Sequence, residues 1–175
     1  ATNRRVDVIA EGFDLAIRVR PPPLEDSELV LKVLGERRMG LVASPDLLAR
    51  HAQPLGPADL QGLPSVALGV PQAEHAWDLR GPDGARAEVR LQPRLVTRGM
   101  LALREAACAG VGVAQLPLMI VQPALDEGRL QRVLPDWAPP HEIIHVVYPS
   151  RRGQLPSVRA LIDHLASAFA VLDEV

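Results

Sequence analysis

The sequence has one cysteine, a single lysine and no large excess of charge of either sign. Because one cysteine, Cys108, cannot form a disulfide within its own chain, a disulfide-stapled secreted scaffold is excluded, and we expect a reducing, cytoplasmic location. The formal net charge of −2 over 175 residues excludes a bulk electrostatic surface for nucleic acid or membrane. No apolar run has membrane-spanning length, and no signal or transit peptide is recognisable, so we expect no membrane partner.

The composition that is present is that of a globular protein with a real core. Apolar residues make up 47% of the chain and charged residues 23%. The arginine-rich basic set, together with abundant alanine, leucine and proline, is typical of GC-rich bacterial coding. The chain begins at "ATNRRVDVIAEG" without a methionine. A length of 175 residues predicts one domain or two small lobes. The missing methionine leads us to expect that the chain is part of a longer protein.

Apolar patterning predicts that strands and helices alternate along most of the chain. Strands are predicted over 13–19, 29–44, 64–69, 93–97, 111–117, 129–134 and 142–149, with a hairpin over 76–91. Helices or helical turns are predicted over 6–12, 44–51, 56–62, 98–110, 117–128 and 155–172. The helix over 117–128 should be kinked or restarted at Pro123. The last helix should bury a stripe of Leu161, Leu165 and Phe169.

This alternation predicts an α/β fold with a mostly parallel sheet. The long extended run over 29–44 is matched late in the chain by the strands at 129–134 and 142–149. Two long crossings indicate two lobes that are joined twice. We expect a discontinuous first subdomain of residues 1–28 and 141–175 and a second subdomain of residues 29–140 that includes the hinge strands.

The stretch "HEIIH", His141 to His145, is a literal H-E-x-x-H, the zinc signature of many metallopeptidases. Eighteen residues separate His145 from His164, a spacing at which a third ligand can appear in such enzymes. The mechanism requires a helix, in which residues four apart lie about 6 Å apart on one face. Here β-branched and aromatic neighbours favour a strand, in which four residues span about 13 Å. We therefore expect no metal, and expect His141 and His145 to be ordinary residues of a core strand.

The other motifs carry no catalytic signal. "AGVGVAQ" contains a G-x-G, but a helix precedes it and a strand follows it, which is the reverse of a dinucleotide-binding fingerprint. Gly110 and Gly112 are better explained as a helix cap and a tight strand entry. Cys108, Trp77 and Trp137 are interpreted as packing residues, and a G-x-S-x-G nucleophile elbow is absent. We therefore expect neither an enzyme nor a bound cofactor.

Four segments, in this order, resemble the effector-binding domain of LysR-type transcriptional regulators. They are "TNRRVDVIAEGFDLAIRV", "LVASPDLLARHAQPLGPADLQG", "LREAACAGVGVAQLPLMIVQPALDEGRLQRVLPDW" and "VVYPSRR", and together they cover nearly the whole chain. The resemblance implies a type 2 periplasmic-binding-protein-like fold of two Rossmann-like subdomains with a two-strand hinge and a small-molecule effector bound between them. It also implies DNA binding through an N-terminal helix-turn-helix that this chain lacks, and homodimers or tetramers formed through the effector domains.

The same resemblance implies that the first strand and helix of the first subdomain precede this chain. The helix N-terminus that they contain would supply part of the effector site. This chain would then carry only the remainder of the pocket.

Ligands of such folds bind at the carboxyl ends of strands and at the N-termini of the helices that follow. These positions are Arg18, Val19, Arg20, Leu68, Gly69, Thr97, Arg98, Gly99, Met100, Gln115, Leu116 and Pro117. The helix that begins near Arg98 offers backbone N–H groups to an anion, and Arg18, Arg20 and Arg98 offer bidentate contacts to a carboxylate. We therefore expect an anionic inducer. The alternative is that these arginines are solvated or form surface ion pairs.

Two functions from different classes fit this fold. The first is ligand sensing in a bacterial transcription factor, and the second is a periplasmic solute-binding protein of a transport system. The upstream gene sequence discriminates between them, because a helix-turn-helix marks the regulator and a signal peptide marks the transport component.

Overall fold

The computed structural model describes residues 6–22, 24, 29–149 and 155–171, so most of the proline-rich segment over 20–28 lies outside the described residues. The chain forms two compact units. Unit 1 consists of Ala1–Arg37 and His141–Val175, and unit 2 consists of Arg38–Pro140. The chain passes from one unit to the other twice, after Arg37 and after Pro140. The sequence placed the first division at 28/29, whereas the strand that follows it here pairs within unit 1.

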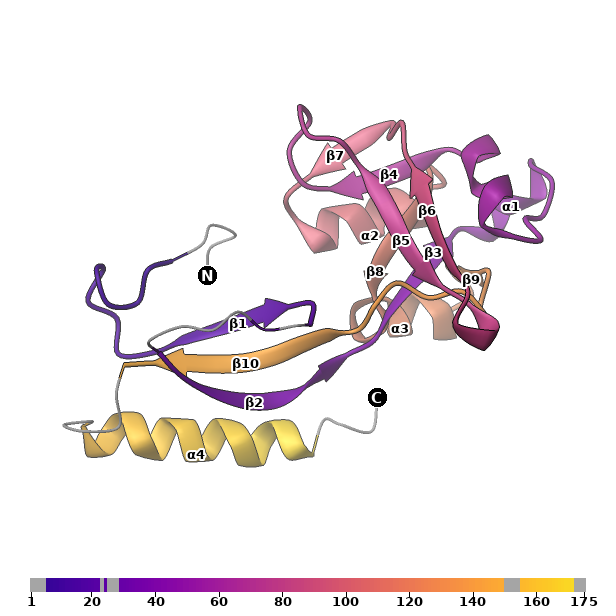
Figure 1. Cartoon of the computed structure of the whole chain (residues 1–175). Helices are drawn as coiled ribbons and strands as arrows, with labels where there is room; N and C mark the ends of the chain where they lie inside the picture. Colours follow the sequence, from indigo (N-terminus) through magenta and orange to yellow (C-terminus); the bar gives the residue numbers. More distant parts are fainter. Residues whose placement is uncertain (1–5, 23, 25–28, 150–154, 172–175) are drawn as a thin grey trace. The chain divides into compact units, whose positions relative to one another are not determined.

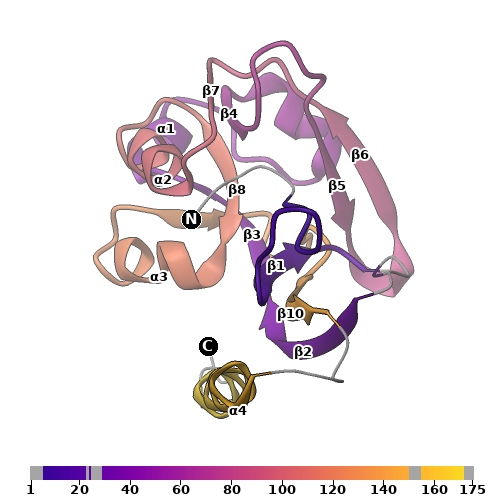
Figure 2. The same ribbon diagram turned by 90° about the vertical axis from the view of Figure 1, so that its left-hand side faces the viewer.

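The described residues of unit 1 form a three-stranded antiparallel sheet and one long helix. The strand order is β1 (Ala16–Arg20), β10 (Glu142–Tyr148), β2 (Val30–Arg37). Helix α4 (Pro156–Ala170) packs against one face of this sheet and is seen end-on in Figure 2. Four residues of the "HEIIH" motif, Glu142 to His145, belong to β10, which confirms the predicted strand for them. His141 precedes β10 and is exposed, so the prediction that it is a core-strand residue is wrong.

The buried stripe of α4 differs from the predicted one. Leu161 is 44% exposed, whereas Val158 and Ile162 are buried at 9% and 4% exposure. Val158, Ile162, Leu165 and Phe169 recur at intervals of three and four residues, which keeps them on one side of a helix. Leu161 is one position before this stripe and therefore faces outward.

Unit 2 is built around a five-stranded mixed sheet. Its strand order is β7 (Leu95–Thr97), β4 (Ser65–Leu68), β8 (Val113–Pro117), β3 (Met39–Ala43), β9 (Gln131–Val133). Strands β7, β4 and β8 are parallel, whereas β3 runs antiparallel to both β8 and β9. The predicted mostly parallel sheet is therefore wrong for unit 1 and holds for only three strands of unit 2. Helix α3 connects β8 to β9, and β3 lies between these two strands and runs antiparallel to both.

Both faces of the unit 2 sheet are covered (Figure 1). Helices α2 (Met100–Cys108) and α3 (Leu118–Asp126) pack on one face. The other face carries α1 (Pro45–Ala49), the 3-10 helix η1 (Pro57–Gly62) and a hairpin of β5 (Ala76–Arg80) and β6 (Arg86–Arg90). A short 3-10 turn, η2 (Pro82–Gly84), closes that hairpin.

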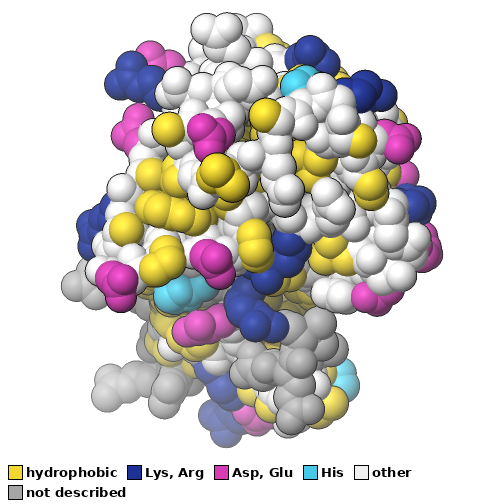
Figure 3. Space-filling view, turned by 90° about the vertical axis from the view of Figure 1, so that its right-hand side faces the viewer, with side chains coloured by type: hydrophobic (Ala, Val, Ile, Leu, Met, Phe, Trp, Pro, Cys, Tyr) yellow, Lys and Arg dark blue, Asp and Glu magenta, His cyan; other side chains and the backbone are white. Residues whose placement is uncertain are grey.

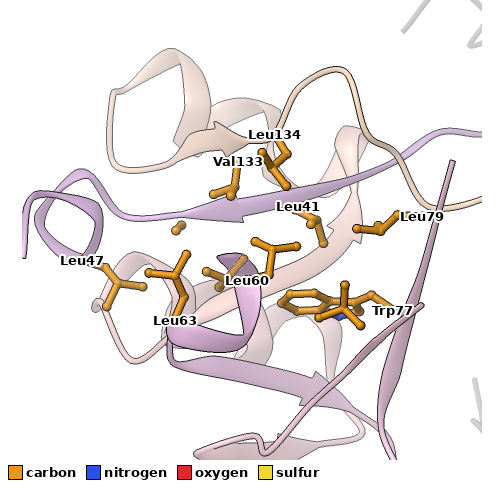
Figure 4. Packing of buried hydrophobic residues seen from close by; sticks show 11 residues of the cluster. Leu41, Leu47, Leu60, Leu63, Trp77, Leu79, Val133 and Leu134 are labelled. Carbon is orange, nitrogen blue, oxygen red and sulfur yellow. The ribbon is translucent and has the colours of Figure 1, made fainter. Parts of the chain in front are cut away.

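Alternation along β3 divides the apolar residues of unit 2 into two cores. Leu41 and Ala43 belong to the core beneath α1, η1 and the hairpin, whereas Val42 belongs to the core beneath α2 and α3. Successive side chains of a strand point to opposite faces of the sheet, so β3 contributes buried residues to both cores. Figure 4 shows the first core, in which the Trp77 ring from β5 lies near Leu60 of η1.

Local signals explain where several elements begin and end. The Ser44 hydroxyl accepts a hydrogen bond from the Leu47 N–H at 3.2 Å and caps α1, as predicted. Gly110 follows α2 with a φ of +72°, which confirms it as a helix cap. Helix α3 continues through Pro123 without a restart.

Two elements differ from the sequence predictions. The extended run over 29–44 divides at Arg38 into β2 and β3. The predicted helix over 6–12 is a single turn, in which the Asp7 carboxylate accepts hydrogen bonds from the Ile9 and Ala10 N–H groups. An Asx side chain that bonds the backbone in this way favours a turn over a continued helix.

Candidate effector site

The carboxyl ends of three parallel strands bring most of the predicted site residues to one edge of unit 2. Leu68 of β4 is the direct partner of Thr97 of β7, and the Gly69 N–H donates to the Thr97 carbonyl at 2.9 Å. Strand β8 runs parallel to β4 and ends at Pro117. Because parallel strands end at the same sheet edge, nine of the twelve predicted residues gather in this region.

Helix α2 begins at this edge. Gly99 is its N-cap in an extended conformation, and no side chain caps the helix. The Thr97 hydroxyl accepts a hydrogen bond from the Gly99 N–H at 3.2 Å. The first turn of α2 carries no acidic side chain. A helix N-terminus of this kind has partial positive charge that is not neutralised by its own sequence, which favours an anion.

The nine residues of unit 2 are not equally accessible. Leu68 is 41% exposed, and Arg98 and Gly99 are also exposed. Leu116 is fully buried in the core beneath α2 and α3, and Pro117 is buried as well. Met100 is half-buried against the same core. Gly69, Thr97 and Gln115 are half-buried. A ligand at this edge would therefore meet Leu68, Thr97, Arg98 and Gly99 first.

The three predicted residues of unit 1 lie together on β1. The Arg18 guanidinium donates to the Val6 carbonyl at 2.8 Å, so it holds the chain segment before β1. Val19 packs on the α4 side of the sheet. Arg20 is exposed, and its guanidinium donates to the carbonyl of Val19 at 2.9 Å. Arg20 is therefore the more accessible cation of the two.

The sequence missed the environment of His145. This residue is 3% exposed and lies directly opposite Arg18 in the pairing of β1 and β10. Burial lowers the pKa of its imidazole, and the positive charges of Arg18 and Arg20 lower it further, although a hydrogen bond at 3.2 Å to the Ile143 carbonyl opposes this. These surroundings favour the neutral form of the buried imidazole. The β-branched run around it predicted burial, but only the pairing register shows the arginine opposite.

No zinc site forms from "HEIIH". His141 stands before the start of β10 with its Nε2 3.9 Å from the Glu36 carboxylate, while His145 is buried in the sheet. Within the described ranges, no group of three or more His, Cys, Asp or Glu side chains is placed to hold a metal ion. The two histidines thus have separate surroundings.

The other singled-out residues are packing residues, as predicted. Trp77 is 4% exposed in the core under the hairpin, and Trp137 packs against that core. Cys108 is half-buried beside the core under α2 and α3. Burial raises the pKa of the Cys108 thiol, and the Arg129 guanidinium, whose Nη1 lies 3.4 Å from the sulfur, counteracts part of this effect. The cysteine is therefore a thiol of low nucleophilicity.

Unit 2 also contains a groove that the sequence did not predict. Its volume is about 940 Å³, and it lies between η1, residues 71–76 and the run from Glu88 to Val96. We call it the hairpin groove. None of the twelve predicted site residues lines it. Local sequence patterns do not predict the hairpin groove, because its walls come from three segments that only the packing of the hairpin brings together.

In the upper part of Figure 3, basic and acidic side chains both occur, with hydrophobic side chains among them. None of the helices in the part of the chain that the structure describes combines the length and apolarity needed to cross a bilayer.

The LysR substrate binding domain family matches residues 1–170 of this chain. The chain is 30% identical over 164 residues to the HTH-type transcriptional activator AaeR of Escherichia coli K12, covering 93% of this chain and 52% of that protein. It is 32% identical over 169 residues to an HTH-type transcriptional regulator of Xanthomonas campestris, covering 94% of this chain and 48% of that protein. The chain thus spans about half the length of the curated relatives that it matches.

Solved structures agree with these sequence relatives. The full-length virulence activator AphB of Vibrio cholerae, described as a member of the LTTR protein family, matches with a TM-score of 0.81 and 27% identity. That match covers 96% of this chain and 56% of AphB. Regulatory domains of this kind have the two-lobed type 2 periplasmic-binding-like fold, which is therefore the fold of this chain.

Proposed function

The chain belongs to the LysR substrate-binding domain family, and we propose on that basis that it is the effector-sensing part of a bacterial transcriptional regulator. The relatives that match along nearly all of this chain are named as transcriptional regulators, which favours sensing over solute uptake. DNA binding would come from a helix-turn-helix outside this chain. The whole protein would act in the cytoplasm as a homodimer or tetramer.

We further propose that the effector carries a carboxylate or another anionic group. One observation carries this proposal: α2 begins at the carboxyl edge of β7, β4 and β8 with a glycine N-cap and no acidic side chain in its first turn. Its partial positive charge favours an anion, and Arg98 adds a full positive charge next to it. The Thr97 hydroxyl adds a neutral hydrogen-bonding group at the same place.

The proposed contributions differ among the predicted residues. Thr97, Arg98 and Gly99 would contact the anionic group, and Leu68 would contact an apolar part of the effector. Leu116 and Pro117 are buried and would support the site from within unit 2 rather than contact the effector.

Effector binding would act on transcription by changing the relative populations of conformations of the regulator. An effector shifts such an equilibrium only by the difference in its affinity for the two states. The chain crosses between its two units twice, at Arg37/Arg38 and at Pro140/His141, and a change of conformation would be absorbed at these crossings.

A thermal-shift panel of matched pairs tests the proposal. Each pair contains an aromatic or aliphatic carboxylate and its neutral amide, for example benzoate and benzamide. We expect at least one carboxylate to raise the melting temperature while its amide does not. Arg98→Gln should reduce that shift, whereas Arg86→Gln, at an exposed position of β6, should retain it. Stabilisation by a neutral compound with none by any carboxylate would reject the anionic effector.

A further inference from the structure

The hairpin groove has an apolar floor within unit 2. Leu60 of η1 is 2% exposed and Leu63 is 9% exposed, and both line the groove together with Leu91, Pro93 and Val96. A groove of about 940 Å³ is within the size range of small-molecule sites. Polar and apolar side chains both line it, so it suits a ligand that has both polar and apolar groups.

A buried hydroxyl lies on the same floor. Ser65 opens β4 and is 4% exposed. Its neighbour Val66 points into the core under α2 and α3, so the Ser65 side chain points to the opposite face of the sheet, where the groove lies. Among the described residues, the Ser65 hydroxyl has no hydrogen-bond partner, although the Ser65 carbonyl accepts from the Arg94 N–H at 2.8 Å. Buried hydroxyls normally have a partner, so this one is available to a ligand.

The walls of the groove carry four charged side chains, of which two pair with each other. Arg90 Nε lies 3.5 Å from a carboxylate oxygen of Glu88, and both residues are exposed. The Glu74 carboxylate and the Arg94 guanidinium also line the groove. Within the described ranges, neither of these two side chains has a hydrogen-bond or ion-pair partner. The groove therefore offers one unpaired charge of each sign above an apolar floor.

We propose that the hairpin groove is a second ligand site, which takes an amphoteric small molecule of the amino-acid type with an apolar side chain. Its carboxylate binds the Arg94 guanidinium and its ammonium group binds the Glu74 carboxylate. Its apolar part covers Leu63 and Val96, and the Ser65 hydroxyl donates to a ligand oxygen. A ligand with only one charge would leave either Glu74 or Arg94 unpaired while partly removing it from water, which disfavours it.

This second site does not depend on the anionic effector proposed at the start of α2, because the two share no residue. Both would be carried by unit 2, and ligands at two sites of one domain can change each other's affinity. Loss of one site should leave binding at the other detectable.

Isothermal titration with matched probes tests the second site. The probes are L-leucine, its deaminated analogue 4-methylpentanoate and its decarboxylated analogue 3-methylbutylamine. L-leucyl-L-leucine serves as a larger amphoteric probe. We expect the two amphoteric probes to bind. The two singly charged analogues should bind at least about tenfold more weakly, because each lacks one of the two charged groups that would bind Glu74 and Arg94.

Substitutions of residues that line the hairpin groove test whether leucine binds there. Arg94→Gln and Glu74→Gln should each weaken leucine binding about tenfold or more, and Ser65→Ala should weaken it by a smaller factor. Arg86→Gln lies on β6 outside the groove and should bind leucine as the unchanged chain does. Arg98→Gln, which impairs the proposed effector site, should also bind leucine normally.

Three results would overturn the proposal. The first is that no amphoteric probe binds at millimolar concentration. The second is that the singly charged analogues bind as well as leucine does. The third is that leucine binding is unchanged in Arg94→Gln and Glu74→Gln while their melting temperatures without ligand match that of the unchanged chain. Loss of carboxylate binding in Arg98→Gln would bear on the effector proposal alone.

Discussion

Arg18 and His145 lie directly opposite each other on the neighbouring antiparallel strands β1 and β10. The histidine is buried, so its positive form would lose hydration and would also face the charge of Arg18. The arginine instead holds the Val6 carbonyl. The second histidine of a zinc-like motif is thus a buried strand residue opposite a cation, and its surroundings favour the neutral imidazole.

The lowered pKa of His145 predicts a pH dependence of stability. Its pKa in the folded chain lies below its unfolded value, so the unfolded chain binds a proton more readily as the pH falls. This contribution to stability is fully present above the unfolded pKa of about 6.5 and is lost as the pH falls below it. Urea unfolding at pH 7.5 and pH 5.5 should show lower stability at the acidic pH.

A pair of variants isolates the histidine. His145→Gln should be less stable at pH 7.5 but should lose less further stability on acidification than the unchanged chain. His164→Gln, at an exposed position of α4, should keep the original pH dependence. Equal pH dependence in all three proteins would show that His145 is not the titrating group.

The ion pair between Arg37 and Glu142 should stabilise unit 1 more than a surface pair does. The Arg37 guanidinium bonds the Glu142 carboxylate through both Nε and Nη2, and the two side chains are only 12% and 23% exposed. A double-mutant cycle with Arg37→Gln and Glu142→Gln should give a coupling free energy of about 1–3 kcal/mol in urea unfolding. The exposed pair of Lys32 and Asp163 is the control and should give less than about 0.5 kcal/mol.

Gly112 should not tolerate a side chain. An added Cβ would lie 2.7 Å from the backbone carbon of Ser65, and backbone cannot move aside as a flexible side chain can. Gly112→Ala should therefore lower the free energy of unfolding by about 1–3 kcal/mol. Gly62→Ala, where an added Cβ meets no atom within 4 Å, should change it by less than about 0.5 kcal/mol. Equal stability of the two variants would contradict the close approach of β8 to β4.

Cys108 should react slowly with thiol reagents at neutral pH. Burial raises its pKa, so little thiolate is present. The rate of alkylation by iodoacetamide in the folded chain should rise only at a higher pH than in the urea-unfolded chain. Arg129→Gln should move the folded profile further toward high pH, because the positive charge of Arg129 lowers the cysteine pKa. Rapid alkylation at pH 7 would contradict this environment.

The sequence predicted elements well where a local signal set them. Ser44 with Pro45 marked the start of α1, Gly110 marked the end of α2, and the "GPDG" turn marked the hairpin. The sequence predicted less well how these elements pack against one another. The direction of β3 relative to β8 depends on how the chain returns, and no residue of β3 records it. The outward position of Leu161 depends on which of several apolar residues meets the sheet.

In the candidate site, too, features set by local sequence were predicted and features set by tertiary packing were not. The strand ends at Leu68 and Thr97 were predicted from patterning, and the parallel pairing brings them together. Leu116 is buried because α2 and α3 cover its face of the sheet. The apolar run alone did not distinguish this buried position from a strand end that is open to a ligand. The hairpin groove required the packing of η1 against β6, which no local pattern encodes.

Backbone NMR titration with a stabilising carboxylate locates the effector site residue by residue. The amide resonances of Gly99, Met100 and Leu101 at the start of α2 should shift most within unit 2, and the matched amide compound should leave them unchanged. Arg98→Gln should reduce the shifts and Arg86→Gln should preserve them. If the carboxylate shifts resonances elsewhere in unit 2 while those at the start of α2 do not move, the proposed effector site is wrong.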